Sequence, residues 1–294
     1  MGRLGGAHMA NLKEIRNRIS SVSSTMQITS AMKMVSAAKL KKAQDAITAM
    51  RPYSDKLTEL LQNLSATLDA DSGSKFSEQR EVNKVLLVSI TSNRGLAGAF
   101  NSNIIKQTNR LINEDYAGKE VSILAIGKKT NDAFKKGNRV VANKSSLYDD
   151  LTFDNVAEVA ELLMDTFIKE EADKIVLVYN KFKNAATQEI MKEQFLPIVP
   201  MEKDDDVQAD YIFEPSKAEI VKQLIPKSLK TQLYKALRDS FASEHGARMT
   251  AMHKATDNAT ELRDQLKLTY NKARQASITN EILEIVGGAE ALNN

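Results

Sequence analysis

The sequence predicts an α/β protein in which long N- and C-terminal helices form an antiparallel coiled coil around a central α/β domain. Three observations predict this class. Small and apolar residues recur at heptad spacing near both ends of the 294-residue chain, and the middle alternates short apolar segments with helical ones. Aromatic residues make up only 5% of the chain, a composition that favours long helices over a large core.

Residues 9–66 are predicted to form the first helix. The preceding 1–8 (MGRLGGAH) are glycine-rich and without pattern, and we interpret them as a leader or a misassigned start. Apolar residues then alternate at steps of three and four, and the stripe continues one register over. They are Leu12, Ile15, Ile19, Val22 and Met26, followed by Ile28, Met32 and Val35. Frequent Ser and Ala predict that the line of contact between the two helices, here called the seam, is narrow. Pro52 predicts a kink or the lower end of the helix.

Residues 80–202 alternate apolar and helical segments, which predicts a Rossmann-like domain with a mostly parallel sheet. The last strand is expected at an edge of the sheet, because its alternating apolar and polar residues fit a strand with one face exposed to water. The expected strands are 84–90, 120–126, 139–143, 174–180 and 188–197, and the expected helices are 99–114, 129–136 and 155–170.

The segment 92–101 (SNRGLAGAFN) follows the first strand, where dinucleotide-binding folds hold a pyrophosphate. Gly95 and Gly98 form only G-x-x-G, which matches neither the G-x-G-x-x-G fingerprint nor the G-x-x-x-x-G-K-[ST] loop. We therefore interpret these glycines as allowing a tight turn from strand to helix, and we expect no cofactor.

Residues 216–288 predict the second long helix, because no proline follows Pro226 and no glycine lies between Gly246 and Gly287. Its stripe is Met252, Ala255, Ala259, Leu262, Leu266, Ala273, Ala276 and Leu283, with Thr269 and Asn280 in two further slots. About 60 helical residues span about 90 Å, whereas a compact chain of this length has a radius of gyration of about 19 Å. Such a helix needs a partner, and the N-terminal helix is expected to supply it in antiparallel orientation.

Positive charge is concentrated on the first helix. The net charge is +3, but residues 10–50 hold seven Lys and Arg against Glu14 and Asp45. No aromatic residues interleave with these bases to stack on nucleic acid, and the apolar face lacks the bulk of a membrane-surface helix. The run therefore favours an acidic protein surface over nucleic acid or anionic lipid, and we expect neither nucleic-acid binding nor bilayer insertion, although a solvated face is the commonest meaning of such a run.

The ionisable residues predict no active site. Cysteine is absent, and His245 and His253 lie eight residues apart without a third ligand nearby, which disfavours a zinc site. Glu244 and Arg248 are spaced i, i+4 and are expected as a surface pair.

Three stretches resemble the γ subunits of bacterial F-type ATP synthases, and the resemblance runs from about Met9 to Leu292. They are KEIRNRISSVSSTMQITSAMKMVSAAKL near the start, SNRGLAGAFNSN in the centre, and ASEHGARMTAMHKATDNA followed by YNKARQASITNEILEIVGGAEAL near the end. Their combination is specific. Ala97 stands where the family often carries cysteine, and the plant-type regulatory insertion is absent.

The resemblance implies a rotor subunit with no chemistry of its own. The coiled coil would be the shaft inside a ring of three α and three β subunits, and the α/β domain would rest on the membrane c-ring beside the ε subunit. Rotation would couple ion flow to ATP synthesis or hydrolysis at the β subunits. The expected location is peripheral, on the cytoplasmic face of the bacterial inner membrane.

The resemblance also implies partner-contact residues. Arg274 and Gln275 resemble the family's hydrogen-bonding catch against a β-subunit loop, with Met32 and Lys33 on the facing part of the first helix. The apolar tip, which includes Ile278, Ile282 and Leu283, would turn in an apolar sleeve, where contacts are non-directional. Packing in the seam, or an ordinary solvated charge, is the alternative interpretation of each of these residues.

Two other classes of protein stay open at this stage. A nucleotide-binding α/β enzyme with a coiled-coil stalk would need the turn at Gly95 to bind phosphate. A free-standing coiled-coil adaptor would account for the two helices but not for the combined motifs.

Overall fold

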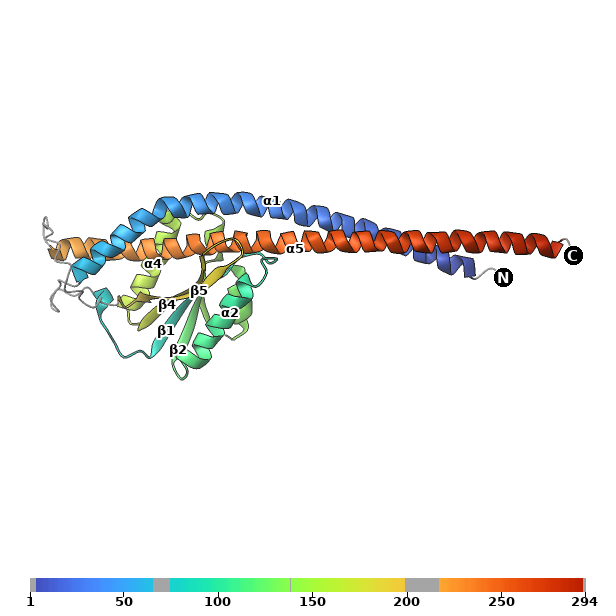
Figure 1. Ribbon diagram of the computed structural model, residues 1–294. Coiled ribbons are helices and arrows are strands. Elements are labelled where there is room, and N and C mark those ends of the chain that lie inside the picture. The colour runs from blue at the N-terminus through green and yellow to red at the C-terminus, as the bar shows by residue number, and fades with distance from the viewer. Residues whose placement is uncertain (1–3, 66–74, 138, 199–216, 293–294) are drawn as a thin grey trace. The chain divides into compact units, whose positions relative to one another are not determined.

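The computed structural model describes residues 4–65, 75–137, 139–198 and 217–292 (Figure 1). The chain folds into two compact units, Met1–Val35 with Met249–Asn294 and, separately, Ser36–Arg248. The domain boundaries predicted above remain predictions, and 66, 199–202 and 216 lie outside the described residues.

Two long helices contribute to both units. Helix α1 spans Leu4–Ser65 and helix α5 spans Lys217–Leu292. Helix α1 continues through Pro52, whose ring is exposed, so this residue does not mark the lower end of the helix. The helix starts within 1–8, and the interpretation of that segment as a leader stays a prediction.

In the first unit, side chains of α1 and α5 pair in opposite order along the chain. Arg16 Nη2 donates to Tyr270 Oη at 2.7 Å, and the hydroxyls of Thr29 and Thr256 lie 2.8 Å apart. Rising positions on α1 thus meet falling positions on α5, which confirms the antiparallel pairing.

On α5, half of the predicted seam positions are displaced by one residue from those that the structure buries. Met252 and Ala259 are buried as expected, but Leu262 and Leu283 are 44% and 63% exposed. The positions turned inward are instead polar or aromatic and recur every seven residues: they are Thr256, Arg263, Tyr270 and Ser277. On α1 the register does not shift, since Ile28 and Val35 are exposed while Thr29 and Ser36 are buried.

Hydrogen bonding explains why polar side chains occupy the seam. A hydroxyl within a helix bonds the carbonyl one turn back, as Thr256 Oγ1 does with Met252 O at 2.8 Å, so its burial leaves no unpaired donor. Small side chains also let the two helices approach closely.

The second unit contains a five-stranded sheet in the order β3-β2-β1-β4-β5. Its strands are β1 (Lys84–Ile90), β2 (Glu120–Ile126), β3 (Val140–Asn143), β4 (Lys174–Phe182) and β5 (Gln188–Leu196). All neighbouring pairs are parallel except β4 with β5, which is the predicted edge strand. The mostly parallel α/β class is therefore confirmed.

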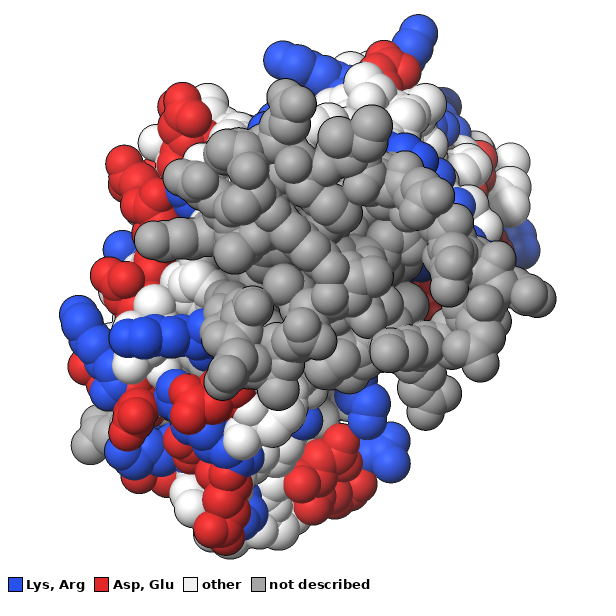
Figure 2. Space-filling model, turned by 90° about the vertical axis from the view of Figure 1, so that its left-hand side faces the viewer, with Lys and Arg blue, Asp and Glu red and all other residues white. Residues whose placement is uncertain are grey.

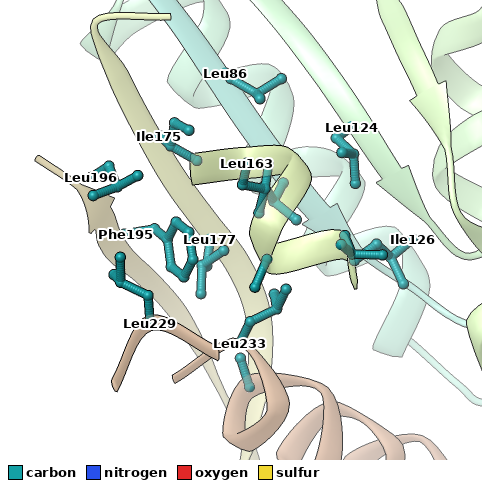
Figure 3. Close-up of a cluster of buried hydrophobic side chains, with 14 of the residues drawn as sticks. Leu86, Leu124, Ile126, Leu163, Ile175, Leu177, Phe195, Leu196, Leu229 and Leu233 are labelled. Carbon is teal, nitrogen blue, oxygen red and sulfur yellow. The ribbon is translucent and has the colours of Figure 1, made fainter. Parts of the chain in front are cut away.

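Helices cover both faces of this sheet (Figure 1). On one face lie α2 (Phe100–Arg110), which continues as a π-helical turn at Leu111–Asp115, and α3 (Lys128–Phe134). On the other lie α4 (Phe153–Ile168) and the first part of α5. Figure 3 shows Leu163 of α4 and Leu229 and Leu233 of α5 directed at the strand residues of this core. The first part of helix α5 is thus built into the second unit, which we call the α/β unit.

Figure 2 shows acidic and basic side chains intermingled among the described residues of this surface. This view shows no field of one sign among them. The positive charge predicted above is a feature of α1 itself.

Candidate functional site

The C-terminal part of α5 carries a cluster of exposed apolar side chains. Ile278, Ile282 and Leu283 are 43%, 55% and 63% exposed, and Ile285 and Val286 are more than half exposed. An exposed apolar run of this kind is the feature expected of a contact surface, and the contact role of these residues stays a prediction. Arg274 and Gln275, one turn before it, are also exposed. The fold therefore leaves the predicted contact residues of α5 accessible.

Met32 and Lys33 are half-buried on α1 and do not face Arg274. The bond between Thr29 and Thr256 places them near position 253 of α5. From position 253 to Arg274 are 21 residues, or about 32 Å of helix. The expectation that the two pairs share one facing region is therefore wrong, and they form two separate sets.

Helix α5 also crosses the place where doubly wound folds bind their ligands. Beside β1 the order of the strands reverses, since β2 lies on one side and β4 on the other, and ligands of this fold class bind at the carboxyl ends of such strands. Here Ser243 Oγ donates to Asn180 O at the end of β4, at 3.0 Å. A Cβ at Gly246 would lie 3.2 Å from Ala185 Cα in the β4–β5 hairpin. The chain's own helix therefore packs against this crevice.

The glycine turn after β1 is held by hydrogen bonds within the turn and to the segment that follows β3. Ser92 N donates to Asn101 Oδ1 at 2.9 Å, and Asn93 Nδ2 donates to Ser145 O at 3.0 Å. Leu96 and Gly98 have φ of 60° and 56°, the left-handed region that a tight turn requires. These features support the interpretation of the segment as a strand-to-helix turn.

Glu244 and Arg248 form a buried ion pair, so the prediction of a surface pair is wrong. Their side chains are 9% and 8% exposed and are joined at 2.7 Å. Arg248 Nη2 also donates to Gly95 O at 3.3 Å and to Arg94 O at 3.4 Å. Burial raises the pKa of the Glu244 carboxyl, although Arg248 and Lys39 oppose this shift. Sequence spacing could not distinguish this pair from an exposed one, and the only signal was the small residues Ser243 and Gly246 beside it.

His245 is buried next to this pair as a neutral ring. Burial, together with the nearby charges of Arg248 and Lys39, lowers its pKa to about 3. Its ring lies edge-on to Phe241 at 4.5 Å. Nowhere in the described residues do three His, Cys, Asp or Glu side chains gather into a possible metal site. The described helices also include none with the length and apolarity needed to cross a membrane.

Comparison with known proteins gives one consistent result. A model of the ATP synthase family matches residues 11–292. The "ATP synthase gamma chain" of Flavobacterium psychrophilum is 73% identical over 97% of this chain and 99% of its own length. The proteins of the same name from Christiangramia forsetii and Geobacter sp. (strain M21) are 70% and 45% identical, each over 97% of this chain and at least 99% of their own length.

Solved structures share the fold. A chain of the Euglena gracilis mitochondrial ATP synthase, from a structure of its OSCP, F1 and c-ring parts, has a TM-score of 0.69, with 96% of this chain and 95% of that chain covered. A chain of the Tetrahymena thermophila central stalk and c-ring has a TM-score of 0.57, with 78% and 99% covered. Both are 23% identical to this chain. The fold and the sequence relatives agree, and the chain belongs to the ATP synthase gamma chain family.

Proposed function

We propose that this chain is the central rotor shaft of an F-type ATP synthase and turns inside a ring of three α and three β subunits. Ion flow through a membrane c-ring would drive its rotation, beside an ε subunit, on the cytoplasmic face of a bacterial inner membrane. The observation that carries this proposal is the family match, which spans both long helices and the α/β unit. The shaft has no catalytic site, and the chemistry belongs to the β subunits.

The asymmetry of the helix pair supports a mechanical role. A rotor shifts the equilibria of its ring only if its contacts differ from one orientation to the next. The exposed side chains of the two helices differ in kind, which supports such a role: Lys13 and Arg18 are exposed on α1, whereas the end of α5 exposes Ile282 and Leu283. The basic side chains suit acidic lever segments of the β subunits, and the apolar end suits a sleeve without directional bonds.

Arg274 and Gln275 offer the first test, because both are exposed and both side chains carry N–H groups that can donate to a partner. Replacing both by alanine should weaken coupling between ion flow and ATP turnover in the assembled enzyme, while the helicity of the isolated chain stays unchanged. Ion pumping per ATP hydrolysed in reconstituted vesicles measures the coupling, and circular dichroism measures the helicity.

The matched control replaces another exposed cation and amide on the same helix, Lys267 and Gln265, by alanine. This control should couple normally. Normal coupling in the Arg274→Ala, Gln275→Ala enzyme would show that these residues make no catch.

Isolation of the native complex tests the partners. The chain should co-purify from washed membranes with subunits of the sizes of α, β, ε and c, and a detergent-free wash that strips F1 should release it. Recovery of the chain alone, or with an unrelated set of proteins, would favour the adaptor class instead.

A further inference from the structure

Helix α5 is held on the α/β unit by two separate sets of contacts. The first lies beside β4, where Ser243 Oγ donates to Asn180 O and Gly246 closely approaches the backbone of Ala185. The second lies at the turn after β1, where the Arg248 guanidinium donates to the carbonyls of Arg94 and Gly95. The first set attaches the helix to β4 and its hairpin, and the second attaches it to the turn that follows β1.

The two sets contact different sides of α5. Ser243 and Arg248 are five residues apart, which separates them by about 140° around the helix axis. A helix held at one point can roll about that point, whereas contacts on two sides oppose rolling in both directions. Carbonyl acceptors on the framework strengthen this hold, because they cannot change rotamer as a side-chain acceptor can.

Burial makes the second set stiff. Glu244 accepts from Arg248 at 2.7 Å with both side chains more than nine-tenths buried, so the guanidinium has little freedom to turn away from the Gly95 carbonyl. Asn180 is similarly fixed, since its Nδ2 donates to Phe100 O at 3.1 Å and its side chain is 1% exposed. Both acceptor sites are therefore positioned before any load is applied.

We infer that Ser243 and Arg248 are positioning residues that fix the angle of α5 about its axis on the α/β unit, so that torque enters α5 without slip. We name this pair of contacts the two-point grip. The inference rests on the proposed shaft function and adds to it the residues through which the α/β unit would turn the helix. Catalysis in the ring alone should not require the grip, because the proposed β-subunit contacts lie at the exposed end of α5, away from Ser243 and Arg248.

The test uses the reconstituted holoenzyme with Ser243→Ala and Arg248→Lys, each alone and together. Both changes are mild. Alanine removes only the hydroxyl of Ser243, and lysine keeps the positive charge of Arg248 but loses the planar guanidinium that reaches two carbonyls. The matched control is Arg110→Ala, which breaks another i, i+4 pair of 2.7 Å, with Glu114, on the exposed surface of α2.

The double variant should lower gradient-driven ATP synthesis at least threefold, while Mg-ATPase activity of the soluble F1 part stays within twofold of wild type. Arg110→Ala should change neither. Since the chain has no cysteine, Lys136→Cys provides a single exposed attachment point for a probe on the α/β unit. Torsional stiffness measured through this probe should fall about twofold in the double variant.

A double variant with normal thermal stability, normal stiffness and a normal ratio of synthesis to hydrolysis would overturn the two-point grip. If the wild-type chain itself failed to support synthesis, the shaft function would be wrong instead. A loss of stability without a change in that ratio would assign Ser243 and Arg248 a purely structural role, which also contradicts the inference.

Discussion

His245 shows how burial changes a single ionisable side chain. Its pKa is about 3 in the folded chain, against the ordinary 6.5. Below pH 6.5 the unfolded chain takes up a proton that the folded chain refuses, so stability is lost as pH falls from 6.5 towards 3. Glu244 acts in the opposite direction, because its pKa is raised by burial. These two neighbouring residues therefore make opposite contributions to the pH dependence of stability.

Replacing His245 by glutamine should remove the histidine part of this response. Between pH 7 and pH 5 the wild-type free energy of unfolding should fall by about 2 kcal/mol more than that of His245→Gln. Urea unfolding at the two pH values measures the difference. The exposed His253→Gln should retain the wild-type pH dependence, and an equal pH dependence in wild type and His245→Gln would show that the buried ring titrates normally.

At the scale of single elements, apolar spacing predicted the strands and helices of the α/β unit but only half of the seam. Apolar runs such as Lys84–Ile90 gave the strand bounds directly, because a parallel sheet is covered on both faces. In the seam, Thr256 and Arg263 occupy core positions that a hydrophobic pattern passes over in favour of Leu262. The pair Glu244–Arg248 was expected on the surface but is buried, because segments distant in the sequence cover it.

The threonine pair provides a test of the seam. Thr29→Val should destabilise the chain by about 1 kcal/mol, because Thr256 loses its partner across the seam. Thr29→Val with Thr256→Val should cost less than twice the single change, since the one hydrogen bond between the two hydroxyls is lost only once. A double-mutant cycle from thermal unfolding measures the coupling, and strictly additive costs would show that the two hydroxyls do not interact.

The core of the α/β unit gives a second test, with adjacent residues of α4. Leu163 is fully buried whereas Leu162 is 39% exposed. Leu163→Ala should cost about 2–5 kcal/mol through lost burial and the cavity that remains. Leu162→Ala should cost less than about 1 kcal/mol. Chemical denaturation of both variants gives the comparison, and equal costs would contradict the placement of α4 over the sheet.

At the scale of the whole molecule, the fold class and family could be predicted from the sequence, since heptads, alternating segments and three motifs agreed. The crossing of α5 over the ligand crevice could not be predicted, because it depends on where a distant helix docks. This crossing predicts that the full chain shows no measurable Mg-ATP binding by calorimetric titration up to about 1 mM. Binding at micromolar concentration would restore the nucleotide-binding alternative.

The polar seam also determines how the two helices can be aligned. A slip of one heptad would set Thr29 against Arg263 and Arg16 against Ser277, and it would break every interhelical bond described above at the same moment. An all-leucine seam would tolerate that displacement, because one leucine replaces another. The polar pairs therefore fix one register of the two helices. Sliding of one helix along the other is resisted by these specific bonds rather than by the amount of buried apolar area.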